Sequence, residues 1–113
     1  MKKEMRVFLE DIKESVERIE EYTQGMSKEH FMEDIQTQDA IIRRLEIIGE
    51  AVKNIPEDFR SKYPDIPWKQ VAGMRDVLIQ GYFGVNLERV WAVVKRDLPE
   101  LKPKVLRILE EAE

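Results

Sequence analysis

Apolar side chains recur at steps of three and four residues along most of the chain, and this spacing limits the fold more than any other feature. Between residues 3 and 24 the apolar positions are Met5, Phe8, Ile12, Val16 and Ile19. Residues three or four apart share one face of an α-helix, whereas a half-buried strand alternates at every second residue. Long alternating stretches are missing from the sequence. The spacing therefore predicts an all-α protein.

The same spacing predicts a second long helix after the first. Its apolar stripe consists of Ile41, Leu45, Ile48, Val52 and Ile55. Gly25 is expected to end the first helix, and Ser27 to cap a short turn. Thr37 or Asp39 can start the second long helix.

Prolines and polar residues divide the second half of the chain. Pro56 and Pro64 bracket a short connector. Pro67 suits the first turn of a third helix, Asn86 can cap a fourth, and a last helical segment is expected to start near Pro99. We therefore expect an antiparallel bundle of four to five helices joined by short links.

Length and composition fit a single small helical domain over residues 1–113. Of these residues 42% are hydrophobic, which is enough for a modest core, and 37% are charged, as expected of helices with one solvated face. The formal net charge of −4 argues against a protein that coats nucleic acid nonspecifically. A local basic groove remains compatible with this charge.

The residue types present exclude several kinds of site. The chain has no cysteine, which excludes disulfides, thiol nucleophiles and cysteine-based zinc sites. Its single histidine, His30, has no partner histidine for a carboxylate-bridged metal, so we interpret it as a surface or capping residue. No phosphate-binding Gly-x-x-x-x-Gly-Lys-Ser/Thr loop occurs. We expect neither a metal nor a cofactor.

Nothing in the sequence predicts export or insertion into a membrane. Acidic residues interrupt the first segment before an apolar stretch of signal-peptide length can form. No apolar run approaches the roughly twenty residues that a membrane-spanning helix needs. We therefore expect a cytoplasmic protein without membrane contact.

One segment, residues 73–84, carries most of the chemical information. It resembles the Arg-x4-His-x-Tyr motif of HepT-like toxins in the HEPN superfamily, with Arg75 and Tyr82 in place and Gln80 where that family has its histidine. The resemblance extends to residues 36–51, 66–68, 90–91 and 97–99, and so covers nearly the whole chain.

The resemblance implies a HEPN-like homodimer that works as a metal-independent endoribonuclease, with motifs from two subunits lining an RNA-binding cleft. It also implies a partner, a minimal nucleotidyltransferase antitoxin that attaches AMP to the Tyr82 hydroxyl. Helix geometry is compatible with a shared site, since position 80 lies about 140° around a helix from position 75. Either the helix distorts near Gly81 or a second chain contributes.

The chemistry needs proton transfer and stabilisation of negative charge on phosphate. Arg75 can grip a phosphate through two parallel hydrogen bonds, although it could instead pair with Asp76 or Glu50. Asp76 lies four residues before Gln80 and could hold that side chain in place. A glutamine amide does not titrate near neutral pH, so we expect impaired cleavage with RNA binding retained. Arg75, Asp76 and Gln80 are the candidate catalytic residues.

Several alternatives stay open. Tyr82 could cap the core beside Phe83 instead of being modified. The basic residues Lys95, Arg96, Lys102, Lys104 and Arg107 could form a wall for RNA or a solvated helix face. A second apolar stripe could lie in a dimer interface or in the monomer core; it comprises Ile42, Ile47 and Ala51.

The function itself has two competitors to the nuclease toxin. One is a noncatalytic subunit that docks the nucleotidyltransferase and presents its substrate. The other is a plain helical scaffold dimer, for which neither cleavage nor modification is expected.

Overall fold

All regular structure in the computed structural model, which describes residues 1–74 and 86–111, is helical. The described elements are, in chain order, α1 (Lys3–Thr23), α2 (Lys28–Glu33), α3 (Ile35–Asn54), α4 (Glu57–Arg60), α5 (Trp68–Ala72), α7 (Leu87–Ala92), the π-helical turn η1 (Val93–Asp97) and α8 (Leu98–Glu111). The predicted all-α fold class is confirmed. The described chain divides into more and shorter helices than the four to five that the sequence indicated.

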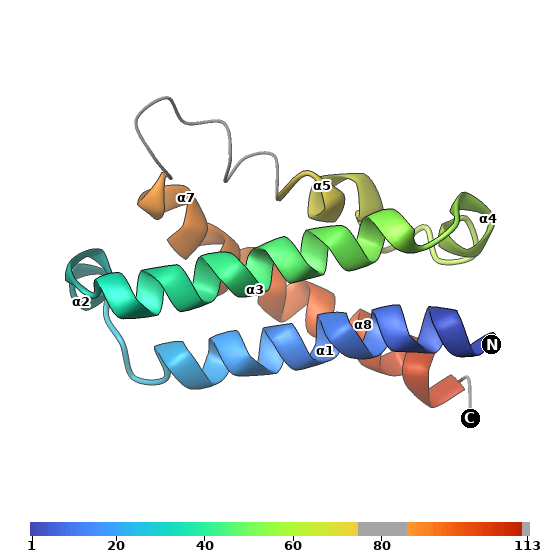
Figure 1. Cartoon of the computed structure of the whole chain (residues 1–113), viewed down its shortest axis with the longest axis horizontal. Coiled ribbons are helices and arrows are strands. Elements are labelled where there is room, and N and C mark those ends of the chain that lie inside the picture. Colours follow the sequence, from blue (N-terminus) through green and yellow to red (C-terminus); the bar gives the residue numbers. More distant parts are fainter. Residues whose placement is uncertain (75–85, 112–113) are drawn as a thin grey trace.

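The two longest helices, α1 and α3, run side by side in opposite directions (Figure 1). Helix α8 crosses behind them, and the short helices α5 and α7 lie on the same side of α3. Helices α2 and α4 occupy opposite ends of the molecule. This arrangement is the antiparallel bundle that the sequence predicted. None of the described helices is long and apolar enough to cross a lipid bilayer.

The core forms where the predicted apolar stripes meet. Ile12 and Ile19 of α1 and Leu45 and Ile48 of α3 are at most 1% exposed. Helix α8 closes this core with further buried residues, which are Leu98, Leu101, Val105, Ile108 and Leu109. The three- and four-residue spacing thus located the buried faces correctly.

Helix α3 begins at Ile35, earlier than the predicted start at Thr37 or Asp39. The cap is Asp34, whose carboxylate accepts hydrogen bonds from the backbone N–H of Thr37 at 3.0 Å and from its hydroxyl at 2.8 Å. The pKa of the Asp34 carboxyl is lowered below its ordinary value. The largest cause is the hydrogen bond from the Thr37 backbone N–H, and the second is the bond from the Thr37 hydroxyl. Thr37 therefore donates hydrogen bonds to the capping residue and is not itself the cap.

The predictions for Ser27 and His30 are confirmed. The Ser27 hydroxyl accepts a hydrogen bond from the backbone N–H of His30 at 3.1 Å and caps α2. The His30 side chain is exposed, and its Nε2 lies 3.7 Å from an Asp34 carboxylate oxygen. Gly25 has a φ of 71°, which is the left-handed conformation that favours glycine after a helix.

The last helices form one uninterrupted rod from Leu87 to Glu111, where the sequence predicted two separate segments. The rod passes through η1, in which the N–H of Leu98 bonds to the carbonyl of Val93, five residues back. Pro99 accounts for this wider turn because it has no N–H to bond the carbonyl of Lys95 and its ring crowds that carbonyl. Pro103 lies inside α8.

The proposed second stripe does not form one exposed face of α3. Ile42 and Ile47 are five residues apart, which separates them by about 140° around the helix. Ile42 is half-buried and packs against the core, whereas Ile47 and Ala51 line a groove beside Phe8 of α1. Ala51 is 5% exposed. The monomer therefore covers much of this apolar surface by itself.

Candidate functional site

The predicted site residues Arg75, Asp76, Gln80 and Tyr82 lie outside the described residues. Their roles therefore remain predictions. The structure does describe the two helices that flank this segment along the chain, which we call its supports. These supports are α5, which precedes it, and α7, which follows it, both on the same side of α3 (Figure 1).

The first support is anchored by a buried tryptophan. Trp68 opens α5, and its indole N–H donates to the carbonyls of Arg60 at 3.1 Å and Tyr63 at 3.0 Å. Pro67 takes the N-cap position of α5, one residue before the predicted first-turn position. Ile66 is 3% exposed and fills the core beneath the connector. The connector that begins after α4 is therefore folded onto the body of the protein.

A second anchor on this connector was missed at the sequence level. The Asp65 carboxylate accepts a hydrogen bond from the guanidinium of Arg107 at 2.7 Å. The backbone carbonyl of Asp65 accepts another from the ammonium of Lys104, also at 2.7 Å. Both partners lie in α8, about forty positions along the chain, and no local sequence signal marks a contact over that separation.

The second support begins at Asn86, as predicted. Its side-chain oxygen accepts a hydrogen bond from the backbone N–H of Arg89 at 3.1 Å, which caps α7. Trp91 stacks on Phe31 of α2 with ring centroids 5.0 Å apart. The ammonium of Lys95 lies 4.8 Å from the centre of the Trp91 ring, within cation–π range.

The predicted basic wall is divided among separate contacts. Lys102 donates to Glu20 of α1 at 2.8 Å, and this hydrogen bond is the main cause that raises the pKa of the Lys102 ammonium. Lys104 and Arg107 hold Asp65, and Lys95 lies over Trp91. Four of these five cations thus contact groups of the protein itself, which favours the solvated-face alternative over a wall for RNA.

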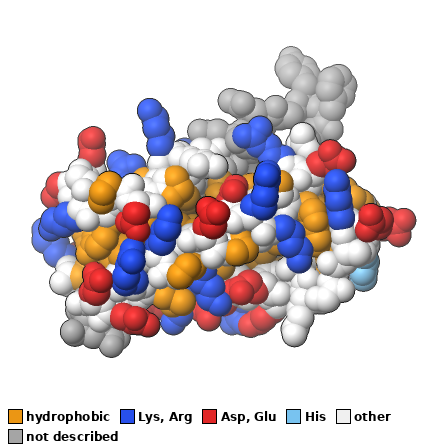
Figure 2. Space-filling view, turned by 180° about the vertical axis from the view of Figure 1, so that it is seen from behind, with side chains coloured by type: hydrophobic (Ala, Val, Ile, Leu, Met, Phe, Trp, Pro, Cys, Tyr) orange, Lys and Arg blue, Asp and Glu red, His pale blue; other side chains and the backbone are white. Residues whose placement is uncertain are grey.

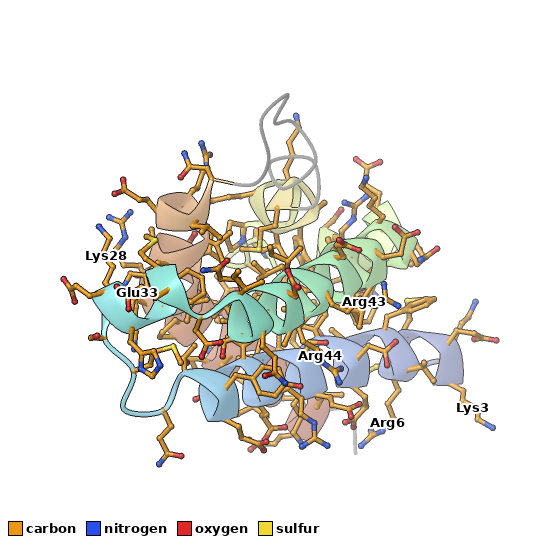
Figure 3. All side chains as sticks on the ribbon, turned by 60° about the vertical axis from the view of Figure 1, so that its left-hand side comes forward. Lys3, Arg6, Lys28, Glu33, Arg43 and Arg44 are labelled. Atoms are coloured by element: carbon orange, nitrogen blue, oxygen red, sulfur yellow. The ribbon has the colours of Figure 1, made fainter. Side chains whose placement is uncertain are left out.

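Charges of both signs are mixed on the face of the molecule that Figure 2 shows. Figure 2 shows Lys and Arg interspersed with Asp and Glu, with apolar side chains between them. The cations labelled in Figure 3 come from three helices and are dispersed along the molecule; they are Lys3, Arg6, Lys28, Arg43 and Arg44. Within residues 1–74 and 86–111 we find no cluster of three or more acidic or histidine side chains suited to hold a metal ion.

Comparison with known families decides the assignment. The family described as ribonuclease HepT-like matches residues 12–108. The chain belongs to this HepT-like ribonuclease family. The matched range includes both supports and the segment between them. The resemblance noted from the sequence is therefore confirmed at the level of the family and of HEPN superfamily membership.

Two similar proteins match this chain over nearly their whole length. A "probable ribonuclease HepT" of Thermococcus cleftensis is 53% identical over 92% of this chain and 94% of its own length. A candidate RNase of Caldanaerobacter subterraneus subsp. tengcongensis is 46% identical over 94% of this chain and 95% of its own length.

A third relative is longer. It is named a gamma-glutamylcyclotransferase and candidate RNase, comes from Methanocaldococcus jannaschii, and is 53% identical over 98% of this chain. The chain spans 50% of the length of that relative. No solved structure matches the chain.

Proposed function

We propose that this HepT-like chain is the toxin component of a HEPN and nucleotidyltransferase pair, and that it acts on RNA in the cytoplasm as a homodimer without a metal. The observation that carries the proposal is the family match over residues 12–108, within which Arg75 and Tyr82 keep the spacing of the HepT-like motif. The names of the relatives, which include the word ribonuclease or RNase, support the same class of activity.

The proposed reaction is attack of a ribose 2′-hydroxyl on the adjacent phosphate. The permanently charged guanidinium of Arg75 would stabilise the negative charge that develops on the phosphate oxygens. A histidine would exchange the proton, but Gln80 cannot titrate in that pH range. Loss of such a group costs roughly a hundred- to ten-thousand-fold in rate. We therefore expect a protein that binds RNA but cleaves it poorly.

The test restores the missing proton-transfer group. The Gln80→His variant should cleave RNA in the presence of a chelator at least a hundredfold faster than the parent, by the same argument that sets the cost of losing the group at roughly a hundredfold or more. In that background Arg75→Ala should remove the gain, whereas Arg18→Ala, on an exposed residue of α1, should keep it. A Gln80→His protein that is folded but inert would contradict the nuclease proposal.

Gln80 itself favours a second candidate, a noncatalytic subunit that docks the nucleotidyltransferase and presents Tyr82. Attachment of AMP would add negative charge and bulk at a cleft intended for RNA phosphate. Intact-mass measurement with ATP and the partner enzyme tests for the modified tyrosine, which both candidates predict, and cleavage by Gln80→His separates them. The noncatalytic subunit predicts one added AMP group on the parent, none on Tyr82→Phe, and no cleavage by Gln80→His.

A further inference from the structure

The short helix α5 depends on its surroundings for its position. It has five residues, too few to be stable alone in water. Its inner side is buried through Val71, which is 2% exposed, and Met74, two residues beyond the end of α5, is 6% exposed. Helix α5 packs mainly against α3. A small cavity of about 40 Å³ lies between α5 and α8, and its lining includes Val71, Met74 and Leu101. The place of Met74 therefore depends on how α5 is held against α3 and next to α8.

Asp65 is the residue that ties this region to α8 by charge. Its carboxylate contacts Arg107 and its carbonyl contacts Lys104, each at 2.7 Å. Asp65 lies three residues before Trp68, the first residue of α5, so the tie acts close to the start of that helix. Apolar packing has no preferred direction, whereas two hydrogen bonds to side chains of one helix restrict where the connector lies along that helix.

We propose that Asp65 is a positioning residue for the reaction: its contacts with Arg107 and Lys104 fix α5 and Met74, and thereby the point from which the chain enters the segment that begins with Arg75. This inference rests on the proposed nuclease function. It assigns no contact with RNA to Asp65.

The experiment uses the full chain with Gln80→His as the active parent. Asp65→Ala should lower kcat roughly two- to fivefold with KM unchanged. This factor is expected when the loss of a partly exposed ion pair reduces the fraction of molecules in which α5 and Met74 are correctly positioned. Asp65→Glu, which keeps the charge, should recover most of the rate. Asp65→Ala combined with Arg107→Gln should be no slower than Asp65→Ala alone, because both changes break the same contact.

The matched control is the other short ion pair of α8. Glu20 bonds to Lys102 at 2.8 Å, and this pair links α8 to α1 without touching the connector. Glu20→Ala should lower stability about as much as Asp65→Ala but leave kcat unchanged. Equal losses of kcat in both variants would overturn the positioning role, as would an unchanged kcat in Asp65→Ala.

A readout independent of cleavage separates this inference from the proposed function. The N–H groups of Val71 and Gly73 bond to the carbonyls of Pro67 and Lys69, each at 3.0 Å. Their hydrogen exchange should accelerate roughly two- to fivefold in Asp65→Ala and stay unchanged in Glu20→Ala. Unchanged exchange in Asp65→Ala would overturn the inference even if the parent is active. An inert parent would instead overturn the proposed function and, with it, the role of Asp65 in the reaction.

Discussion

Ser15 is fully buried in the middle of α1, with 0% of its surface exposed. Its hydroxyl has no hydrogen-bond partner in the part of the chain that the structure describes. A buried hydroxyl without a partner costs free energy, and serine is also a weaker helix former than alanine. The side chain at position 15 is small, as close packing of α1 against its neighbouring helices requires.

Ser15→Ala should therefore raise the free energy of unfolding by about 1 kcal/mol, measured by urea denaturation. The control is Ser61→Ala, because the Ser61 hydroxyl is exposed and donates to the carbonyl of Glu57 at 2.7 Å. That variant should be neutral or slightly less stable. A destabilised Ser15→Ala protein would indicate an unrecognised partner for the hydroxyl.

The cap of α3 makes part of the stability depend on pH. The pKa of Asp34 is lowered in the folded protein from an ordinary value of 3.8, chiefly by the hydrogen bonds from Thr37. A lowered pKa gives a contribution that is complete above the unfolded value and is lost as the pH falls through the folded value. The contribution of Asp34 is thus present at neutral pH and disappears in strong acid.

Asp34→Ala should lower Tm by a few degrees at pH 7. The difference from the parent should shrink as the pH falls below 3.8, the ordinary value of the carboxyl. Calorimetry of both proteins across the acid range measures this difference, and Asp39→Ala, on an exposed residue of the same helix, is the control. A difference that stays constant down to the lowest pH would contradict the assignment of the cap.

At the scale of elements, Pro103 is the least expected feature of α8. It lies inside the helix and is exposed, and it cannot bond to the carbonyl of Pro99, four residues earlier. Pro103→Ala should restore that bond and raise the free energy of unfolding by about 1 to 3 kcal/mol. Glu100→Ala, another exposed position of α8, should change stability little. A loss of stability in Pro103→Ala would show that the proline is needed to shape the helix.

Helix faces and most caps could be predicted from the sequence because they depend on local spacing. Ser27 and Asn86 cap their helices as predicted. The start of α3 could not be fixed, since Asp34, Thr37 and Asp39 are all residue types that cap helices. The continuity of the last rod was also missed, because Pro99 normally indicates a boundary and the π-helical turn accommodates it.

At the scale of the whole molecule, the family and the fold class could be predicted from the sequence, because both depend on patterns that extend over most of the chain. The Asp65 contacts with α8 could not be predicted, because they join positions about forty residues apart without a local signal. Arg75 and Gln80 were predicted from the motif, and Asp76 from its four-residue spacing to Gln80. All three lie outside the described residues. The variants proposed above therefore test the chemistry of the site.

The proposed cleft uses motifs from two subunits, so the protein should be a homodimer in solution. Sedimentation equilibrium should give about twice the chain mass of 13.4 kDa. The mass should not change with Gln80→His, since that substitution alters only the proton-transfer group. A strictly monomeric protein at all concentrations would contradict the shared cleft.

The π-helical turn also keeps the apolar sides of the two helices that it joins aligned. Val90, Val94 and Leu98 are buried at two successive steps of four residues, and a regular α-helix would rotate their direction by about 80° over that distance. The wider turn absorbs this rotation, so that α7 and α8 present their apolar sides to the same core. A π-helical turn holds one residue more than an α-helical turn, so the loss of one residue between Val94 and Leu98 would be absorbed by a change to regular α-helix, in which the Pro99 ring would crowd the carbonyl four residues before it. The extra residue is therefore what allows a proline inside an otherwise continuous helix.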